Sequence, residues 1–256
     1  MEPASHLFEP IILGGVTLAN RIAVSPMCQY SAEDGSANDW HVQHLGSLSV
    51  SGAGLLIVEQ TAVEPAGRIS HGCLGLYSDA NQAALARAIA LCRRCGGARL
   101  GIQLAHAGRK ASAKIPWQGG GPLARDDAPW TTVAPSAIPF DENWPVPQAL
   151  DEGGLARIRD AHAEAANRAD RLGFDLVELL GAHGFLLHSF LSPISNRRSD
   201  RYGGSLVNRM RFPLAVAAAV RAVWPREKAL GMRITGFDWI PGGITLGETG
   251  TFAREL

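Results

Sequence analysis

The chain has 256 residues, a length that suits one large α/β domain. Its 24 Lys and Arg residues balance 24 Asp and Glu, so it lacks the basic excess that nucleic acids and anionic membranes attract. No apolar run reaches spanning length, the first residues do not follow the pattern of a signal peptide, and a disulfide framework would need more cysteines than Cys28, Cys73, Cys92 and Cys95. We therefore expect a soluble protein in the reducing cytoplasm, without nucleic-acid or membrane partners.

Apolar runs of strand length alternate along the chain with stretches of helical periodicity. The strand-like runs cover residues 21–26, 54–63, 98–108, 174–184 and 229–238. The helical stretches cover residues 78–97, which Ser78 can cap, 153–173 and 205–225. Strands that alternate with helices are parallel and joined by crossovers, and strands that are apolar on both faces are covered by those helices. The pattern predicts an α/β fold.

Two α/β architectures compete, and the strand ends favour a (β/α)₈ TIM-barrel type. A doubly wound nucleotide fold needs G-x-G-x-x-G after its first strand, where this chain has "SPMCQY". A barrel instead gathers polar residues at the C-terminal strand ends, and here these are Cys28, Tyr30, Glu59, Gln60, Thr61, Gln103, His106, His183 and Arg233. The segment 109–150 is too long for a simple connection, so we expect it to cap the barrel mouth of a single domain, residues 1–256.

Several stretches carry a family resemblance that runs through the whole chain. They are "SPMCQYSA", "GLLIVEQTAVEPAGRI", "GIQLAHAGRK", "APSAI", "AHGFLLHSFLSPISNRRSDRYGGSLVNRMRF" and "MRITGFDW". In this order they resemble the old yellow enzymes, and within that family the thermophilic-like branch of FMN-dependent ene reductases. The run S-N-x-R-x-D-x-Y-G-G-S, residues 195–205, is especially specific to the family.

The resemblance implies a flavin at the barrel mouth and an enone-type substrate stacked on it. The residues implied to contact FMN are Ser25, Pro26, Met27, Cys28, Gln60, Gln103 and Arg233, with the Cys28 thiol tuning the redox potential and Arg233 lying near N1 and O2. Those implied to contact the substrate are Tyr30, Leu180, His183 and Phe185, and those implied to be catalytic are His183, Tyr30 and Cys28. In the implied ping-pong mechanism NADPH or NADH gives hydride to flavin N5 and leaves, and the substrate then takes hydride at its β-carbon.

Three positions depart from the family pattern. Leu180 stands where the family has the first histidine of His-x-x-His or His-x-x-Asn, so one of two donors to the substrate carbonyl is absent. Phe185 stands in place of a tyrosine, and Gln60 where a small residue is usual. Losing one donor of such a pair costs about 2.7–4 kcal/mol of transition-state stabilisation in other enzymes. We therefore expect weakened or altered activation of the carbonyl.

Without the family resemblance, the same residues could have purely structural roles. His183 could be a hydrogen-bonded core residue, Cys28 a small buried hydrophobe and Arg233 half of a structural ion pair. His41 and His44 have no carboxylate partner evident in the sequence, which suggests packing or surface positions. Cys92 and Cys95 lack the second pair that a metal site needs. Trp117 and Trp130 either line a pocket or fill the core of their own loop.

The largest departure from the family pattern is the number of strand–helix units. About five strand–helix units can be counted, whereas a closed barrel has eight, and the family builds its phosphate site from the last two strand-end loops. The strands at residues 21 and 229 are expected to have unpaired edges. A non-catalytic barrel fragment, stabilised by self-association or by a partner chain, is therefore the alternative function, and we expect a homo-oligomer. A Schiff-base aldolase is disfavoured, because no strand ends in a suitable lysine.

Overall fold

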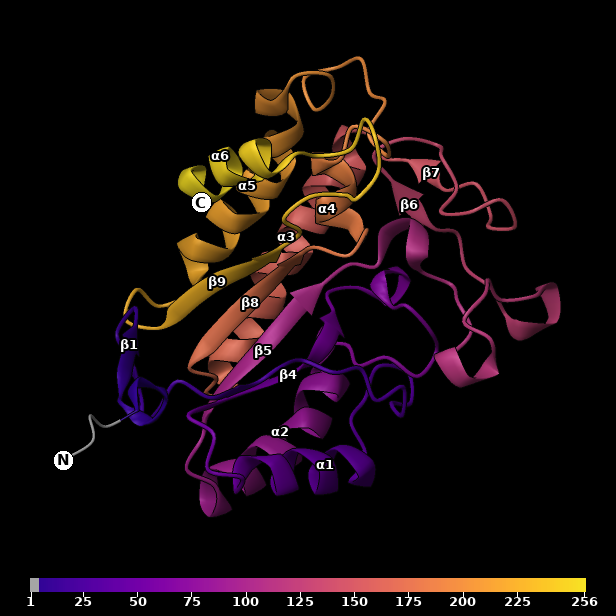
Figure 1. Cartoon of the computed structure of the whole chain (residues 1–256). Helices are drawn as coiled ribbons and strands as arrows, with labels where there is room; N and C mark the ends of the chain where they lie inside the picture. Colours follow the sequence, from indigo (N-terminus) through magenta and orange to yellow (C-terminus); the bar gives the residue numbers. More distant parts are fainter. Residues whose placement is uncertain (1–4) are drawn as a thin grey trace.

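A computed structural model describes residues 5–256, and its centre is a sheet of five parallel strands (Figure 1). The strands lie in chain order β3 (Ala23–Val24), β4 (Leu55–Ala62), β5 (Arg99–Ala105), β8 (Leu176–Gly181) and β9 (Ala229–Ile234). Each crossover therefore moves one place in the same direction, as in a (β/α)₈ barrel. All five predicted strands are confirmed. Within residues 5–256 the sheet stays open, with β3 and β9 at its edges.

Helices cover the outer face of this sheet, as the sequence periodicity predicts. They are α1 (Asp39–Ser49), α2 (Asp79–Cys95), α3 (Glu152–Arg171), α4 (Leu186–Leu191), α5 (Leu206–Val223) and α6 (Leu246–Glu255). The Ser78 hydroxyl accepts from the amide of Asn81 and caps α2, as expected. Outward-facing strand residues such as Val177 and Leu179 join helix residues in the main core. No helix in residues 5–256 is both long and apolar enough to cross a membrane.

The inner face of the sheet is apolar at the N-terminal strand ends. An antiparallel hairpin, β1 (Ile11–Leu13) and β2 (Val16–Leu18), lies there. Its Val16 and Leu18 pack against Leu55, Leu176 and Ala229 in a second core cluster. Arg99 lies at the same end, where its Nε donates to the carbonyl of Thr17 at 3.2 Å. Gln103 and Arg233 lie farther along their strands, toward the C-terminal edge of the sheet.

The segment after β5 lies at that C-terminal edge, beyond the arrowhead of β5 (Figure 1). It contains three 3₁₀ turns, Gly108–Lys110, Pro116–Gln118 and Arg125–Asp127, and two short parallel strands, β6 (Val133–Ala134) and β7 (Gln148–Ala149). Trp130 donates from its indole to the carbonyl of Ala66 at 3.1 Å and packs edge-on against His71, so it fills the base of the segment. Trp117 is exposed and meets the Tyr30 ring edge-on.

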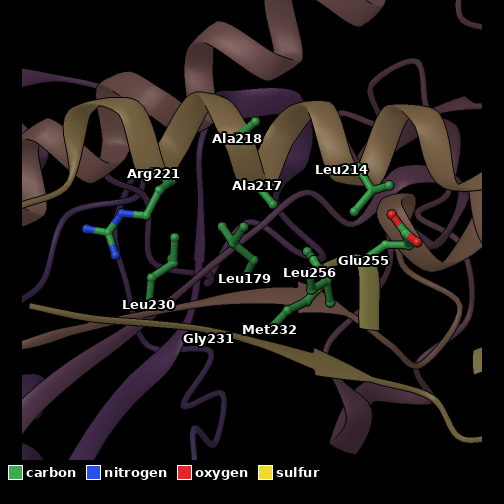
Figure 2. Close-up of a pocket in the computed structure, with 10 residues that line it drawn as sticks. All are labelled: Leu179, Leu214, Ala217, Ala218, Arg221, Leu230, Gly231, Met232, Glu255 and Leu256. Atoms are coloured by element: carbon green, nitrogen blue, oxygen red, sulfur yellow. The ribbon is translucent and has the colours of Figure 1, made fainter. Parts of the chain in front are cut away.

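The free edge of β9 borders a groove of about 410 Å³ beneath α5 and the end of α6 (Figure 2). Leu179, Leu230 and Met232 of the sheet face Leu214 and Ala217 of α5 across it. An apolar groove beside an unpaired strand is the surface that a further strand or a second chain would cover.

Candidate functional site

The C-terminal strand ends bring the predicted site residues to one edge of the sheet. Gln60 of β4 pairs in register with Gln103 of β5, and Leu180 of β8 pairs with Arg233 of β9. The Cys28 thiol, in the segment that follows β3, lies 3.9 Å from the amide oxygen of Gln60. In the ladder between β5 and β8, Gln103 pairs with Glu178, so the two glutamines and the Leu180–Arg233 pair lie two residues apart along the strands.

His183 follows β8 and presents an exposed imidazole. The ring accepts or donates no hydrogen bond within residues 5–256; its one close ring neighbour is Phe185, edge-on at 6.5 Å. Partial desolvation by the surrounding protein and the positive charges of Arg233 and Lys110 lower the pKa of His183 below 6.5. The ring is therefore neutral at pH 7 and can donate from one nitrogen to a carbonyl oxygen. His183 is therefore not the hydrogen-bonded core histidine that the sequence taken alone also allowed.

Arg233 lies half-buried on the inner face beside Leu180. Within residues 5–256 its guanidinium forms no ion pair or hydrogen bond, unlike the guanidinium groups of most arginines of this chain. The structural ion pair considered from the sequence is thus not formed. A partly buried cation without a counter-charge is suited to stabilise negative charge on a bound group.

The segment between β3 and α1 holds Cys28 and Tyr30 near β4. Burial, with contributions from Cys73 and Glu59, raises the pKa of the Cys28 thiol, so the sulfur stays protonated at neutral pH. Tyr30 has a left-handed backbone, φ 51°, and burial raises the pKa of its phenol. Of the other residues implied to line the flavin in this segment, Ser25 and Met27 are exposed and Pro26 is half-buried.

Gln60 and Gln103 differ in what their amides already contact. The Gln103 amide donates to Glu178 Oε1 at 2.6 Å. The Gln60 Nε2 is buried and has no hydrogen-bond partner in the structure. Because an unpaired buried donor is costly, this nitrogen marks a place where an acceptor is missing.

Leu180 lies at the end of β8 with only 2% of its surface exposed. It packs with Ala105, Ala182 and Phe185 in a small apolar cluster. Phe185 also lies 4.9 Å from the Lys110 ammonium. The position that holds a histidine in the family is therefore sealed by apolar groups.

The structure corrects one expectation from the sequence, because His41 has a buried carboxylate partner. Its Nε2 lies 3.5 Å from Glu59 Oε1, and the other oxygen of Glu59 accepts from the amide of Gln29 at 3.0 Å. The ladder between β4 and β5 shifts register between Val58 and Gln60, and such a shift turns Glu59 out of the regular alternation. Glu59 thereby braces the loop between Cys28 and Tyr30. A glutamate inside an apolar strand was the available signal, since buried carboxylates need partners.

His106, another strand-end residue, has a supporting role. Its Nε2 lies 2.9 Å from Glu64 Oε1, and its Nδ1 accepts from the amide of Gly108 at 3.0 Å. Arg157 contacts the second oxygen of Glu64. Both ring nitrogens are thus engaged within the protein.

The unpaired groups at this edge of the sheet fit the ring system of a flavin. An orphan amide donor at Gln60, a cation without a counter-charge at Arg233 and a neutral thiol at Cys28 suit a flat heterocycle that has carbonyl acceptors and gains negative charge. The fit concerns the ring system alone. The sheet of residues 5–256 has five parallel strands, and the family's phosphate site is built from the loops of the last two of eight.

Comparison with known proteins agrees with this fit. Residues 6–256 match the model of the NADH:flavin oxidoreductase / NADH oxidase family. An NADH:flavin oxidoreductase of Gibberella zeae is 42% identical over 240 residues, which cover 92% of this chain and 58% of that protein. An NADPH dehydrogenase of Geobacillus sp. (strain WCH70) is 41% identical over 252 residues, covering 98% of this chain and 69% of that protein. The chain thus spans about three fifths to two thirds of these relatives.

Comparison with solved structures points to the same family. Morphinone reductase in complex with tetrahydroNAD superposes with a TM-score of 0.81 at 30% identity, over 97% of this chain and 71% of that one. An old yellow enzyme from Pichia sp. AKU4542 gives 0.85 at 26% identity, over 99% of this chain and 67% of that one. The chain therefore belongs to the NADH:flavin oxidoreductase / NADH oxidase family, oxidoreductases of the old yellow enzyme type whose cofactor is FMN and whose reductant is NAD(P)H.

Proposed function

We propose that this chain reduces the C=C bond of α,β-unsaturated carbonyl compounds, as an FMN-dependent NAD(P)H oxidoreductase with ping-pong kinetics. The observation that carries the proposal is the His183 imidazole, which follows β8, is neutral and exposed, and has no hydrogen-bond partner among residues 5–256. A neutral, exposed N–H just beyond a strand end is suited to hold the oxygen of a carbonyl group.

The roles of the other residues follow from their surroundings. When bound, FMN supplies the hydride acceptor for NAD(P)H and the hydride donor for the substrate. Arg233 offsets negative charge at the flavin ring, and Gln60 and Gln103 offer amides to its edge. Cys28 contributes a protonated thiol, and Tyr30 with Trp117 forms an aromatic border for the substrate. Since Leu180 offers no hydrogen bond, His183 alone polarises the carbonyl.

Residues 109–150 are proposed to cap this site within a single flavin-binding domain. Arg109 donates to the carbonyls of Ile138 and Pro139, and the Lys110 ammonium lies 4.8 Å from the Phe140 ring. These contacts tie the far part of the segment to the end of β5. The cap would exclude water from the reacting atoms. A reducing compartment such as the cytoplasm is also proposed, in keeping with four free cysteines.

The test is spectroscopic and kinetic. The purified protein is titrated with FMN, and flavin absorbance that remains with the protein after gel filtration supports the cofactor. Stopped-flow measurements then follow flavin reduction by NADPH and by NADH, and reoxidation by a cyclic enone, with His183→Ala as the comparison. The proposal is wrong if flavin-loaded protein is reoxidised by the enone equally fast with and without the His183 ring.

A second candidate function is a non-catalytic barrel fragment that pairs with another chain. The observations that favour it are the unpaired edges of β3 and β9 and the apolar groove beside β9. Light scattering combined with flavin analysis separates the two candidates. A homo-oligomer that retains FMN agrees with the enzyme, whereas a flavin-free oligomer favours the fragment.

A further inference from the structure

His183 lies in a backbone turn that needs support from its surroundings. Its φ is 60° and that of Gly184 is 78°, so two consecutive residues are left-handed. A histidine adopts this conformation only where other contacts outweigh the local strain. What holds the turn therefore decides where the His183 ring points.

Three hydrogen bonds from three different segments hold this turn. The His183 amide donates to Thr235 Oγ1 at 3.0 Å, from the residue after β9. The Lys110 ammonium, from the turn after β5, donates to the His183 carbonyl at 2.8 Å. The Gly184 amide donates to Nδ1 of His188, in α4, at 2.8 Å.

The His188 ring is in turn fixed by Asp238. Because Nδ1 accepts a hydrogen bond, the neutral ring carries its proton on Nε2, which lies 3.0 Å from Asp238 Oδ1. The other oxygen of Asp238 accepts from Ser192 Oγ at 2.6 Å and from the Ile244 amide at 2.9 Å. Burial opposes the charge of Asp238, but these hydrogen bonds outweigh it and lower the pKa of the carboxyl to about 2. The carboxylate is thus charged, buried and fully engaged.

The same arrangement occurs at the end of β5. There the Gly108 amide donates to Nδ1 of His106, and the Nε2 of His106 faces Glu64. Gly108 is also left-handed, with φ 62°. The backbone carbonyl of His106 further accepts from the amide of Leu186, at the start of α4, at 3.0 Å. The two turns are therefore joined, and Lys110 reaches His183 from the first of them.

We propose that His188 and Asp238 are positioning residues that act through Gly184 to aim the His183 ring, with Thr235 fixing the same turn from the other side. None of the three needs to touch the substrate. The carboxylate orients the imidazole, the imidazole fixes the glycine amide, and the amide sets the left-handed turn. Their effect on turnover rests on the proposed function, but their effect on the turn does not.

The test compares matched variants at His188 by amide hydrogen exchange, without any flavin. In His188→Leu the Gly184 amide loses its acceptor, and its exchange is expected to speed up at least about tenfold relative to that of Val177 in β8. In His188→Asn the side-chain oxygen replaces Nδ1, and protection should return. Equal protection of Gly184 in His188→Leu, or no rescue by His188→Asn, overturns the proposal.

Thr235 gives a second pair that removes a single hydroxyl. Thr235→Val should expose the His183 amide to exchange, and Thr235→Ser should restore its protection. In flavin-loaded protein, His188→Leu should slow reoxidation by an enone about tenfold, or about 1.4 kcal/mol, and leave reduction by NAD(P)H unchanged. If the amides respond as expected but no flavin binds, the positioning network stands and the proposed function fails. If flavin-loaded His188→Leu is reoxidised at the wild-type rate although its Gly184 amide is exposed, the network does not aim a catalytic ring.

Discussion

Leu180 of β8 pairs in register with Arg233 of β9, so that an apolar side chain and a cation without a counter-charge lie side by side on the inner face. In the family this strand position carries a histidine, and here Ala105, Ala182 and Phe185 seal it. Under the proposed function, Arg233 would serve the cofactor, and His183 would be the one donor to the substrate oxygen at this strand end within residues 5–256.

Leu180→His is expected to restore a second donor to the substrate carbonyl. The rate of flavin reoxidation by an enone should rise about tenfold or more, because only in that half-reaction does the oxygen gain charge. Flavin reduction by NAD(P)H should change little. Stopped-flow measurement of both half-reactions checks this.

Leu180→Met, of similar volume, is the control for packing at this position. The buried imidazole is expected to lower the free energy of unfolding by about 1–3 kcal/mol, because its ring nitrogens enter an apolar cluster. Reoxidation no faster than in Leu180→Met, with equal flavin content, would mean that Leu180 marks a site for a different acceptor.

Cys28 is expected to tune the flavin and to attack nothing, because its thiol stays protonated. Cys28→Ala should shift the midpoint potential of the bound flavin and alter both half-reaction rates while FMN remains bound. Redox titration against a reference dye measures the shift, and mass spectrometry after turnover tests for an adduct. Loss of FMN from Cys28→Ala, or a covalent adduct on wild-type Cys28, contradicts this role.

His183 should titrate below the ordinary histidine pKa of 6.5, because burial and two nearby cations disfavour its charged form. The neutral ring should therefore dominate down to pH 6.5, and enone reduction should change with His183 protonation only below that pH. Lys110→Met removes one cation and should raise the pKa of His183, although not fully, since burial is the largest cause. NMR titration of the ring protons measures both values. A pKa above 6.5 in the wild-type protein would refute the electrostatic description.

Asp238 should make stability depend on pH in the acid range. Its folded pKa is about 2, below the ordinary value of 3.8, so its contribution is fully present above pH 3.8 and is lost as the pH falls through 2. The difference corresponds to about 2 kcal/mol. Urea denaturation at pH 5 and at lower pH should show that the free energy of unfolding falls less steeply with decreasing pH in Asp238→Asn than in the wild type. Identical declines in the two proteins would show that Asp238 is not stabilised by its neighbours. Glu64→Gln, at the equivalent His106–Glu64 pair after β5, should likewise make the free energy of unfolding fall less steeply with decreasing pH.

The sequence by itself determined the five strands of the central sheet, the three long helices α2, α3 and α5, and the edge of the sheet to which the candidate site residues belong. Hydrophobic periodicity is a local property of the sequence, so a run such as 174–184 predicts a strand that helices cover. Residues that end parallel strands must lie at the same edge of the sheet. The motif around His183 likewise identified the family, because a long run of matched residues does not need tertiary contacts to be read.

Only the tertiary structure decided how the site is held. The pairs His41–Glu59, His106–Glu64 and His188–Asp238 each join side chains from separate elements, and a sequence does not show which carboxylate an imidazole will meet. The left-handed turn at His183 is equally nonlocal. Thr235, Lys110 and His188 supply the hydrogen bonds that outweigh its strain, and folding brings Thr235 from the end of β9 and Lys110 from the end of β5.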